Sequence, residues 1–276
     1  MGPVQRVGRV FSPLDEELAL LSGSLTPRQQ EHVAHLALWM PFERAAQMLE
    51  RVLGVQVSEP TVRRQTERAG ALYEARQTAQ SQQPLPDSPA KSSGEKQAFS
   101  TDGAYVSLVG GQWAEVRTLA IGEVKDKTSA QEAGEVQTCN ITYVSRMVDA
   151  ETFGEVAEVE MQRRGVRHAK AVCAVTDGAD WIQGFIDVHR PDAVRILDFP
   201  HAAEHGTLLL EALRQAGVAV PAQVLERSLH ILKHRGPGLL LRWCARLPAS
   251  LSEDEAVQKQ LRYFRKRESM MQYPVY

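Results

Sequence analysis

The sequence lacks the features that mark several large classes of protein. Its 276 residues include only three cysteines, which lie far apart and form no Cys-x-x-Cys pair. This odd, scattered set argues against a disulfide framework or a zinc ribbon and indicates reduced thiols. No apolar run reaches the roughly 18 residues of a membrane-spanning helix, and the first residues carry no apolar segment typical of secretory signals. These absences predict a cytoplasmic protein with no membrane partner.

Net charge is also small, since 32 basic and 34 acidic residues give a formal net charge of −2. The chain as a whole therefore has no strong attraction to nucleic acid, and any such contact must use local basic patches. Solvated helix faces are the other interpretation of these patches, because charge runs usually lie at the surface. The basic residues cluster at Arg63, Arg64 and Arg68, at Arg163, Arg164 and Arg167, at Lys233, His234 and Arg235, and at Arg262, Arg265, Lys266 and Arg267.

Three helices are predicted in the first part of the chain. Residues 26–29, Thr-Pro-Arg-Gln, form a capping box with proline at the first helical position, which predicts a helix over residues 27–39. Apolar residues at helical spacing predict a second helix over residues 42–53, and Gly54 is expected to end it in a left-handed conformation. A third helix is expected over residues 59–77.

The third predicted helix carries side chains suited to DNA. A helix, a glycine-containing turn and a second capped helix are the pattern of a helix-turn-helix motif. Val62 and Ala69 are expected to face the interior, and arginines on the outer face suit phosphates and base edges because their fork is bidentate. An ordinary three-helix bundle with a charged surface is the other interpretation. The predicted DNA-binding residues are Thr61, Arg63, Arg64 and Arg68.

A change of composition divides the chain. Residues 78–97 are rich in proline, serine and glutamine and lack apolar periodicity, which is typical of a linker. The sequence thus predicts a helix-turn-helix region over residues 1–77, the linker over 78–97, an α/β core over 98–205 and a helical segment over 206–276.

The predicted core begins with strands and then alternates helices with strands. Period-two apolar patterns separated by turn signals, including Gly110-Gly111, indicate three antiparallel strands. This order predicts an α/β fold with a ribonuclease-H-like mixed sheet and flanking helices, and such sheets carry their sites at the carboxyl ends of strands. Strands are expected over residues 98–109, 112–124, 138–147, 170–176 and 193–199, and helices over 149–165 and 180–190.

Two aspartates stand out within these strands. Asp102 interrupts the first strand and Asp177 ends the fourth, and a glycine follows each of them. Cleavage or transfer of phosphodiesters by two metal ions needs carboxylates on rigid elements, and oxygen ligands favour Mg²⁺ or Mn²⁺ over zinc. We therefore predict that Asp102 and Asp177 are catalytic metal ligands. Turns are the other interpretation, because Asp-Gly is a common turn dipeptide.

A second group of residues begins at the end of the fifth predicted strand. Asp198 precedes His201 by three positions at a strand-to-helix turn. Such an acid is expected either to orient the histidine or to cap the helix. An ordinary turn residue at Asp198 is the other interpretation.

Five segments together resemble bacterial insertion-sequence transposases of the ISKra type, a group within the DDE class. The resemblance extends from about Val10 to Tyr276. It implies that Asp102 and Asp177 are the first and second catalytic acids and that Asp198 and His201 match an acid-x-x-His signature. The segments are SPLDEEL, AAQMLERVLGVQVSEPTVRR, STDGAYVSLVGGQWAEVRTLAIGEV, VTDGADWI and ILDFPHAAEH.

The resemblance also implies cofactors and partners. It predicts Mg²⁺ or Mn²⁺ as cofactor, the DNA ends of the mobile element as partner, a homo-oligomer in the intact enzyme and a nucleoid-associated location. The third acid of the family, a glutamate near a glycine-serine-glycine motif beyond a helical insertion, has no counterpart in this sequence. We therefore expect a truncated copy with an incomplete catalytic core, able to bind metal and DNA but with little strand transfer.

Two further hypotheses come from the same residues. A non-enzymatic DNA-binding fragment would regulate or inhibit transposition, with its salt-dependent affinity residing in residues 1–80. A metal phosphohydrolase unrelated to transposases would cleave phosphate esters without preference for a DNA end. Its ligands would be drawn from Asp102, Asp177, Asp198, His201 and His205.

Overall fold

The computed structural model describes residues 25–82, 95–126, 136–221, 223–248, 251 and 253–275. Residue contacts divide the chain into two compact units, residues 1–83 and 84–276. The SPLDEEL segment and most of the predicted 78–97 linker lie outside the described residues. Among the helices that are described, none is long and apolar enough to cross a membrane.

The first unit contains the three helices that the sequence predicts: α2 (Pro27–Trp39), α3 (Phe42–Leu53) and α4 (Glu59–Ser81). The capping box is present, because the Thr26 hydroxyl accepts the Gln29 backbone N–H and the Gln29 side chain accepts the Thr26 N–H. Gly54 ends α3 with a φ of 65°, a conformation that glycine adopts without steric cost.

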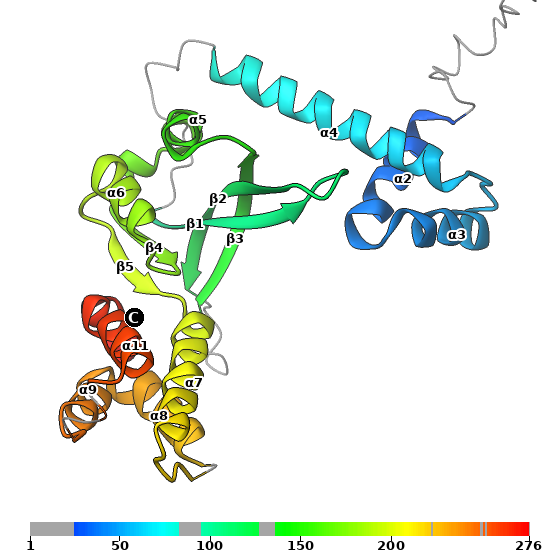
Figure 1. Ribbon diagram of the computed structural model, residues 1–276. Coiled ribbons are helices and arrows are strands. Elements are labelled where there is room, and N and C mark those ends of the chain that lie inside the picture. The colour runs from blue at the N-terminus through cyan, green and yellow to red at the C-terminus, as the bar shows by residue number, and fades with distance from the viewer. Residues whose placement is uncertain are drawn as a thin grey trace, which may run out of the picture. The chain divides into compact units, whose positions relative to one another are not determined.

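A small apolar cluster holds these helices together. It comprises Leu25, Val33, Ala45, Leu49 and Val62, all buried. Val62 thus faces inward as predicted, whereas Ala69, predicted inward, is exposed. The prediction failed there because α4 runs past α2 and α3 (Figure 1), and no buried residue follows Val62 in the described part of this helix.

The second unit is an α/β structure with a mixed five-stranded sheet flanked by helices (Figure 1). The strand order is β3-β2-β1-β4-β5. β1 is antiparallel to β2, and β2 to β3, whereas β4 is parallel to both β1 and β5. The strands are β1 (Lys96–Ser107), β2 (Trp113–Asp126), β3 (Val136–Arg146), β4 (Ala171–Thr176) and β5 (Val194–Leu197).

Two helices cover one face of this sheet. α5 (Ala150–Arg163) and the short η1 (Val166–His168) precede β4, and α6 (Asp180–His189) connects β4 to β5. Side chains of α5 and α6 pack on strand residues, and Phe99 of β1 meets Phe185 of α6 edge to face at 6.3 Å. This face is the main core of the second unit, and it fixes the strands on which the predicted acids lie.

A helical segment follows β5 and has a core of its own. Apolar residues from its helices pack together with Leu197, the last residue of β5. The segment therefore continues directly from the sheet. Its elements are α7 (Phe199–Gln215), α8 (Val224–Arg235), α9 (Gly238–Cys244), α11 (Glu255–Lys266), η2 (Glu268–Met270) and η3 (Tyr273–Val275).

Candidate functional site

Asp102, the first predicted catalytic acid, lies within β1, and Asp177, the second, follows the end of the adjacent parallel strand β4. β1 and β4 pair with an offset of 75 positions, which places Phe99 opposite Ala174. Asp102 and Asp177 are separated by the same 75 positions, three residues beyond that pair, and Asp177 directly follows Thr176, the last residue of β4. Neighbouring strands lie about 4.8 Å apart. The pairing itself ends at Phe99 and Ala174, and the same offset extended by three residues would set the two aspartates side by side.

The two acids belong to the face of the sheet away from α5 and α6. Phe99 and Ala174 are buried beneath those helices. Successive strand side chains alternate between faces, so three positions further on Asp102 and Asp177 belong to the opposite face. Asp102 is exposed and Asp177 is half-buried. Both carboxylates are thus open to a ligand from solvent.

Each carboxylate is held locally by a backbone N–H, and its other oxygen forms no hydrogen bond with any residue that the structure describes. The Asp102 Oδ1 accepts the N–H of Gly103 at 2.7 Å, and the Asp177 Oδ1 accepts the N–H of Ala179 at 2.8 Å. Neither acid forms an ion pair with any residue that the structure describes. Asp102-Gly103 lies inside β1 and is no turn, whereas Asp177-Gly178 does begin one.

Asp198 is related to Asp177 by the register of the next strand pair, β4 and β5. β4 and β5 pair with an offset of 21 positions, as in Thr176 opposite Leu197, and the same 21 positions separate Asp177 from Asp198. The Asp198 N–H donates to the Thr176 carbonyl at 2.8 Å, which carries the alignment past the end of β5. Three acids therefore follow one another, Asp102 within β1 and the other two just after the ends of β4 and β5.

The spacing of this row limits what it can bind. Two strand spacings separate Asp102 from Asp198, roughly 10 Å, which is too far for one ion. Among the described residues no three acidic, histidine or cysteine side chains form a group that could hold a metal ion. Asp102 and Asp177, on adjacent strands, remain a pair of oxygen donors that suits Mg²⁺ or Mn²⁺.

The acid-x-x-His segment does not make the contacts expected of it. Asp198 occupies the N-cap of α7, yet its side chain makes no capping hydrogen bond. His201 approaches Glu204 instead, with 3.9 Å between its Nδ1 and the Glu204 Oε2. His205 bonds Gln260 through Nδ1 at 2.7 Å. The ligand set of the phosphohydrolase hypothesis is therefore not gathered around one point.

Sequence reasoning missed a contact between α11 and the turn after β4. The Tyr263 hydroxyl donates to the backbone carbonyl of Asp177 at 3.1 Å. Burial raises the pKa of Tyr263 to about 12; nearby Arg267 opposes this rise, and the Asp177 and Glu204 carboxylates add to it. The only signal in the sequence was the basic cluster that contains Arg267, and that cluster alone does not indicate which loop it contacts.

The predicted DNA-binding side chains lie on about the first three turns of α4. Arg63 is exposed and forms an ion pair with Glu67 at 2.7 Å. The Arg64 guanidinium donates to the Thr61 hydroxyl at 3.3 Å. Arg68 is exposed. These residues occupy neighbouring turns, so the helix presents a short basic surface.

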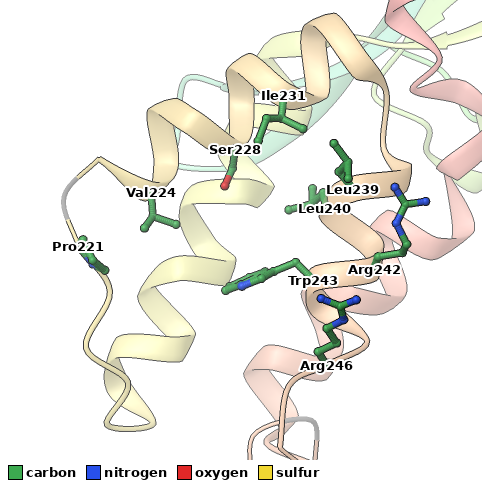
Figure 2. A pocket seen from close by; sticks show the side chains of 9 residues that line it. All are labelled: Pro221, Val224, Ser228, Ile231, Leu239, Leu240, Arg242, Trp243 and Arg246. Carbon is green, nitrogen blue, oxygen red and sulfur yellow. The ribbon is translucent and has the colours of Figure 1, made fainter.

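A separate cavity of about 580 Å³ lies between α8 and α9 (Figure 2). Val224, Ser228 and Ile231 point into it from α8, and the Trp243 indole enters it from α9 (Figure 2). None of the three aligned acids lines this cavity. Its mostly apolar wall suits an apolar or aromatic group rather than a metal ion.

No model of a known protein family matches this chain, and a search of curated proteins finds no match either.

Proposed function

We propose that this chain is a DNA transposase of the insertion-sequence DDE type, in which Asp102 and Asp177 bind a divalent cation and α4 contacts DNA. The strand order β3-β2-β1-β4-β5, with three antiparallel strands followed by two parallel ones, supports a ribonuclease-H-like assignment of the sheet. The order in which the acids follow the helical unit along the chain supports the transposase class.

The offset of 75 positions in the β1–β4 pairing, which also separates Asp102 from Asp177, is the observation that carries this proposal. Two ionised carboxylates at one level of adjacent strands repel each other, and neither has a cationic partner among the described residues. Like charges directly opposite each other on neighbouring strands destabilise a sheet. A bound cation removes the repulsion and makes the arrangement favourable.

The chemistry of the site follows from these positions. A bound Mg²⁺ or Mn²⁺ would polarise a phosphodiester and lower the pKa of an attacking water. Asp102 and Asp177 would supply its oxygen ligands and fix its place at the sheet edge. The hydrogen bonds from the N–H groups of Gly103 and Ala179 orient the two carboxylates before the ion arrives, which limits the ordering needed on binding.

Loss of one acid tests the proposal. Asp177→Asn keeps the shape of the side chain and removes its charge, so we expect the affinity for Mn²⁺ to fall by roughly tenfold, equivalent to about 1.4 kcal/mol. Titration of the purified protein with Mn²⁺, followed by electron paramagnetic resonance, measures the change. Nicking of supercoiled DNA in Mn²⁺ should fall in parallel.

Asp187→Asn is the matched control. It makes the same charge change on α6, where Asp187 is exposed and pairs with Arg195, and exposed ion pairs contribute little. Equal Mn²⁺ binding by wild type and by an Asp102→Asn, Asp177→Asn double variant would rule out the metal site. DNA binding that survives such a result would favour the non-enzymatic DNA-binding alternative.

A further inference from the structure

The turn that carries Asp177 is held by a helix far along the chain. Tyr263 lies on α11, 86 positions after Asp177, and its hydroxyl donates to the Asp177 carbonyl at 3.1 Å. One turn further on, the Arg267 Nε–H donates to the Gly178 carbonyl at 3.1 Å. Two consecutive carbonyls of the turn are thus bound by two side chains from one end of α11.

The two side chains also hold each other. The Arg267 guanidinium lies over the Tyr263 ring at 3.9 Å, which is within the range of a cation–π interaction. Its Nη1–H reaches the Tyr263 carbonyl at 3.4 Å. On the other side, the His205 ring from α7 stacks on Tyr263 at 3.3 Å. Tyr263 is therefore fixed between an arginine and a histidine.

Further contacts hold α11 both to the start of α6 and to the core of the helical segment. Lys266 forms an ion pair with Asp180, the first residue of α6. The buried residues Val257, Leu261 and Phe264 fix α11 in the core of the helical segment. The turn after β4 therefore rests on a rigid element and does not depend on its own sequence alone for its conformation.

We infer that Tyr263 and Arg267 are positioning residues that hold the Asp177 turn in the conformation that binds a divalent cation. The inference rests on the proposed function. The side chain of Asp177 is oriented through the N–H of Ala179, and that N–H belongs to the turn that α11 holds. If the turn is no longer held, the Asp177 carboxylate stays chemically intact but is no longer oriented. Groups that orient metal ligands in this way affect metal affinity without touching the metal.

Tyr263→Phe tests the inference, because it removes the hydroxyl and retains the ring that stacks on His205. We expect the affinity for Mn²⁺ to fall by about tenfold, the lower end of the loss seen when a group that orients a metal ligand is removed. The effect should vanish in an Asp177→Asn background, since Tyr263 acts through Asp177. A loss of general stability would instead appear in both backgrounds.

Tyr273→Phe is the matched control. The Tyr273 hydroxyl donates to the backbone carbonyl of Leu197 at 2.8 Å, so the same kind of bond is lost at a neighbouring strand end. This variant should bind Mn²⁺ as the wild type does. Equal loss in both variants would overturn the inference, because it would show an unspecific effect on the helical segment.

Hydrogen exchange provides a readout that needs no metal. Arg267→Ala should speed the exchange of the Gly178 and Ala179 amides, and unchanged exchange would overturn the inference. Mn²⁺ binding that depends on Asp177 but not on Tyr263 would overturn this inference and leave the proposed function standing. Wild-type protein that binds no Mn²⁺ would overturn the proposed function and the inference with it.

Discussion

Gly178 is the residue at which the turn after β4 is most constrained. Its φ of 76° lies in the left-handed region that side chains other than glycine rarely adopt. A Cβ at this position would also overlap the Arg267 side chain. The backbone conformation therefore favours glycine, and any other residue would in addition force Arg267 to move. The sequence alone shows only the common Asp-Gly dipeptide, which gives no sign of the arginine that packs against it.

We predict that Gly178→Ala destabilises the second unit by about 1–3 kcal/mol, the range expected for a residue held in a rare backbone conformation. It should also weaken Mn²⁺ binding, since Arg267 must move. Urea unfolding of the full chain measures the first effect. Gly184→Ala is the control: nothing lies within 4 Å of its Cβ in the helix α6, so we expect a gain of up to about 1 kcal/mol. A neutral Gly178→Ala would contradict the account of the turn.

Among the elements, the helices of the first unit were the most predictable from sequence. Their ends depend on local chemistry: the Thr26–Gln29 capping box begins α2, and Gly54 ends α3. The burial of α4 was less predictable, because Leu72 and Tyr73 are 63% and 60% exposed. Periodicity shows which residues share a face, but not whether another element covers it.

The basic surface of α4 leads to a prediction about DNA affinity. An Arg64→Ala, Arg68→Ala double variant should lower the affinity for duplex DNA and reduce the slope of log affinity against log salt by about one for each lost phosphate contact. Fluorescence anisotropy at several salt concentrations measures both. Arg76→Ala, an exposed arginine further along α4, is the control, and an equal effect there would argue against a localised interface.

At the scale of the whole molecule, the two units have separate apolar clusters. Leu49 is fully buried in the cluster of the first unit, and Ile186 in the sheet core of the second. The sequence indicated this division through its change from helical to strand periodicity. The contact between α11 and the Asp177 turn could not be predicted from the sequence, because no local pattern relates residues 86 positions apart.

Separate cores predict separate unfolding. Leu49→Ala should lower the stability of the first unit by about 2–5 kcal/mol, the loss typical of a buried leucine, and leave the second unchanged. Ile186→Ala should do the reverse. Hydrogen exchange followed by mass spectrometry assigns each loss to its unit. Simultaneous acceleration across both units in either variant would show that they unfold as one.

The shared level of Asp102 and Asp177 also determines where the chain tolerates insertions and deletions. A single residue inserted within β4 would move every later residue by one position. Asp177 would then turn toward the core face and Thr176 would take its place opposite Asp102, because side chains alternate along a strand. Extra residues between Arg163 and Ala171, outside the sheet, would leave the alignment unchanged. Drift in chain length should therefore accumulate in the connections, while the strand segments that lead to each acid keep their length.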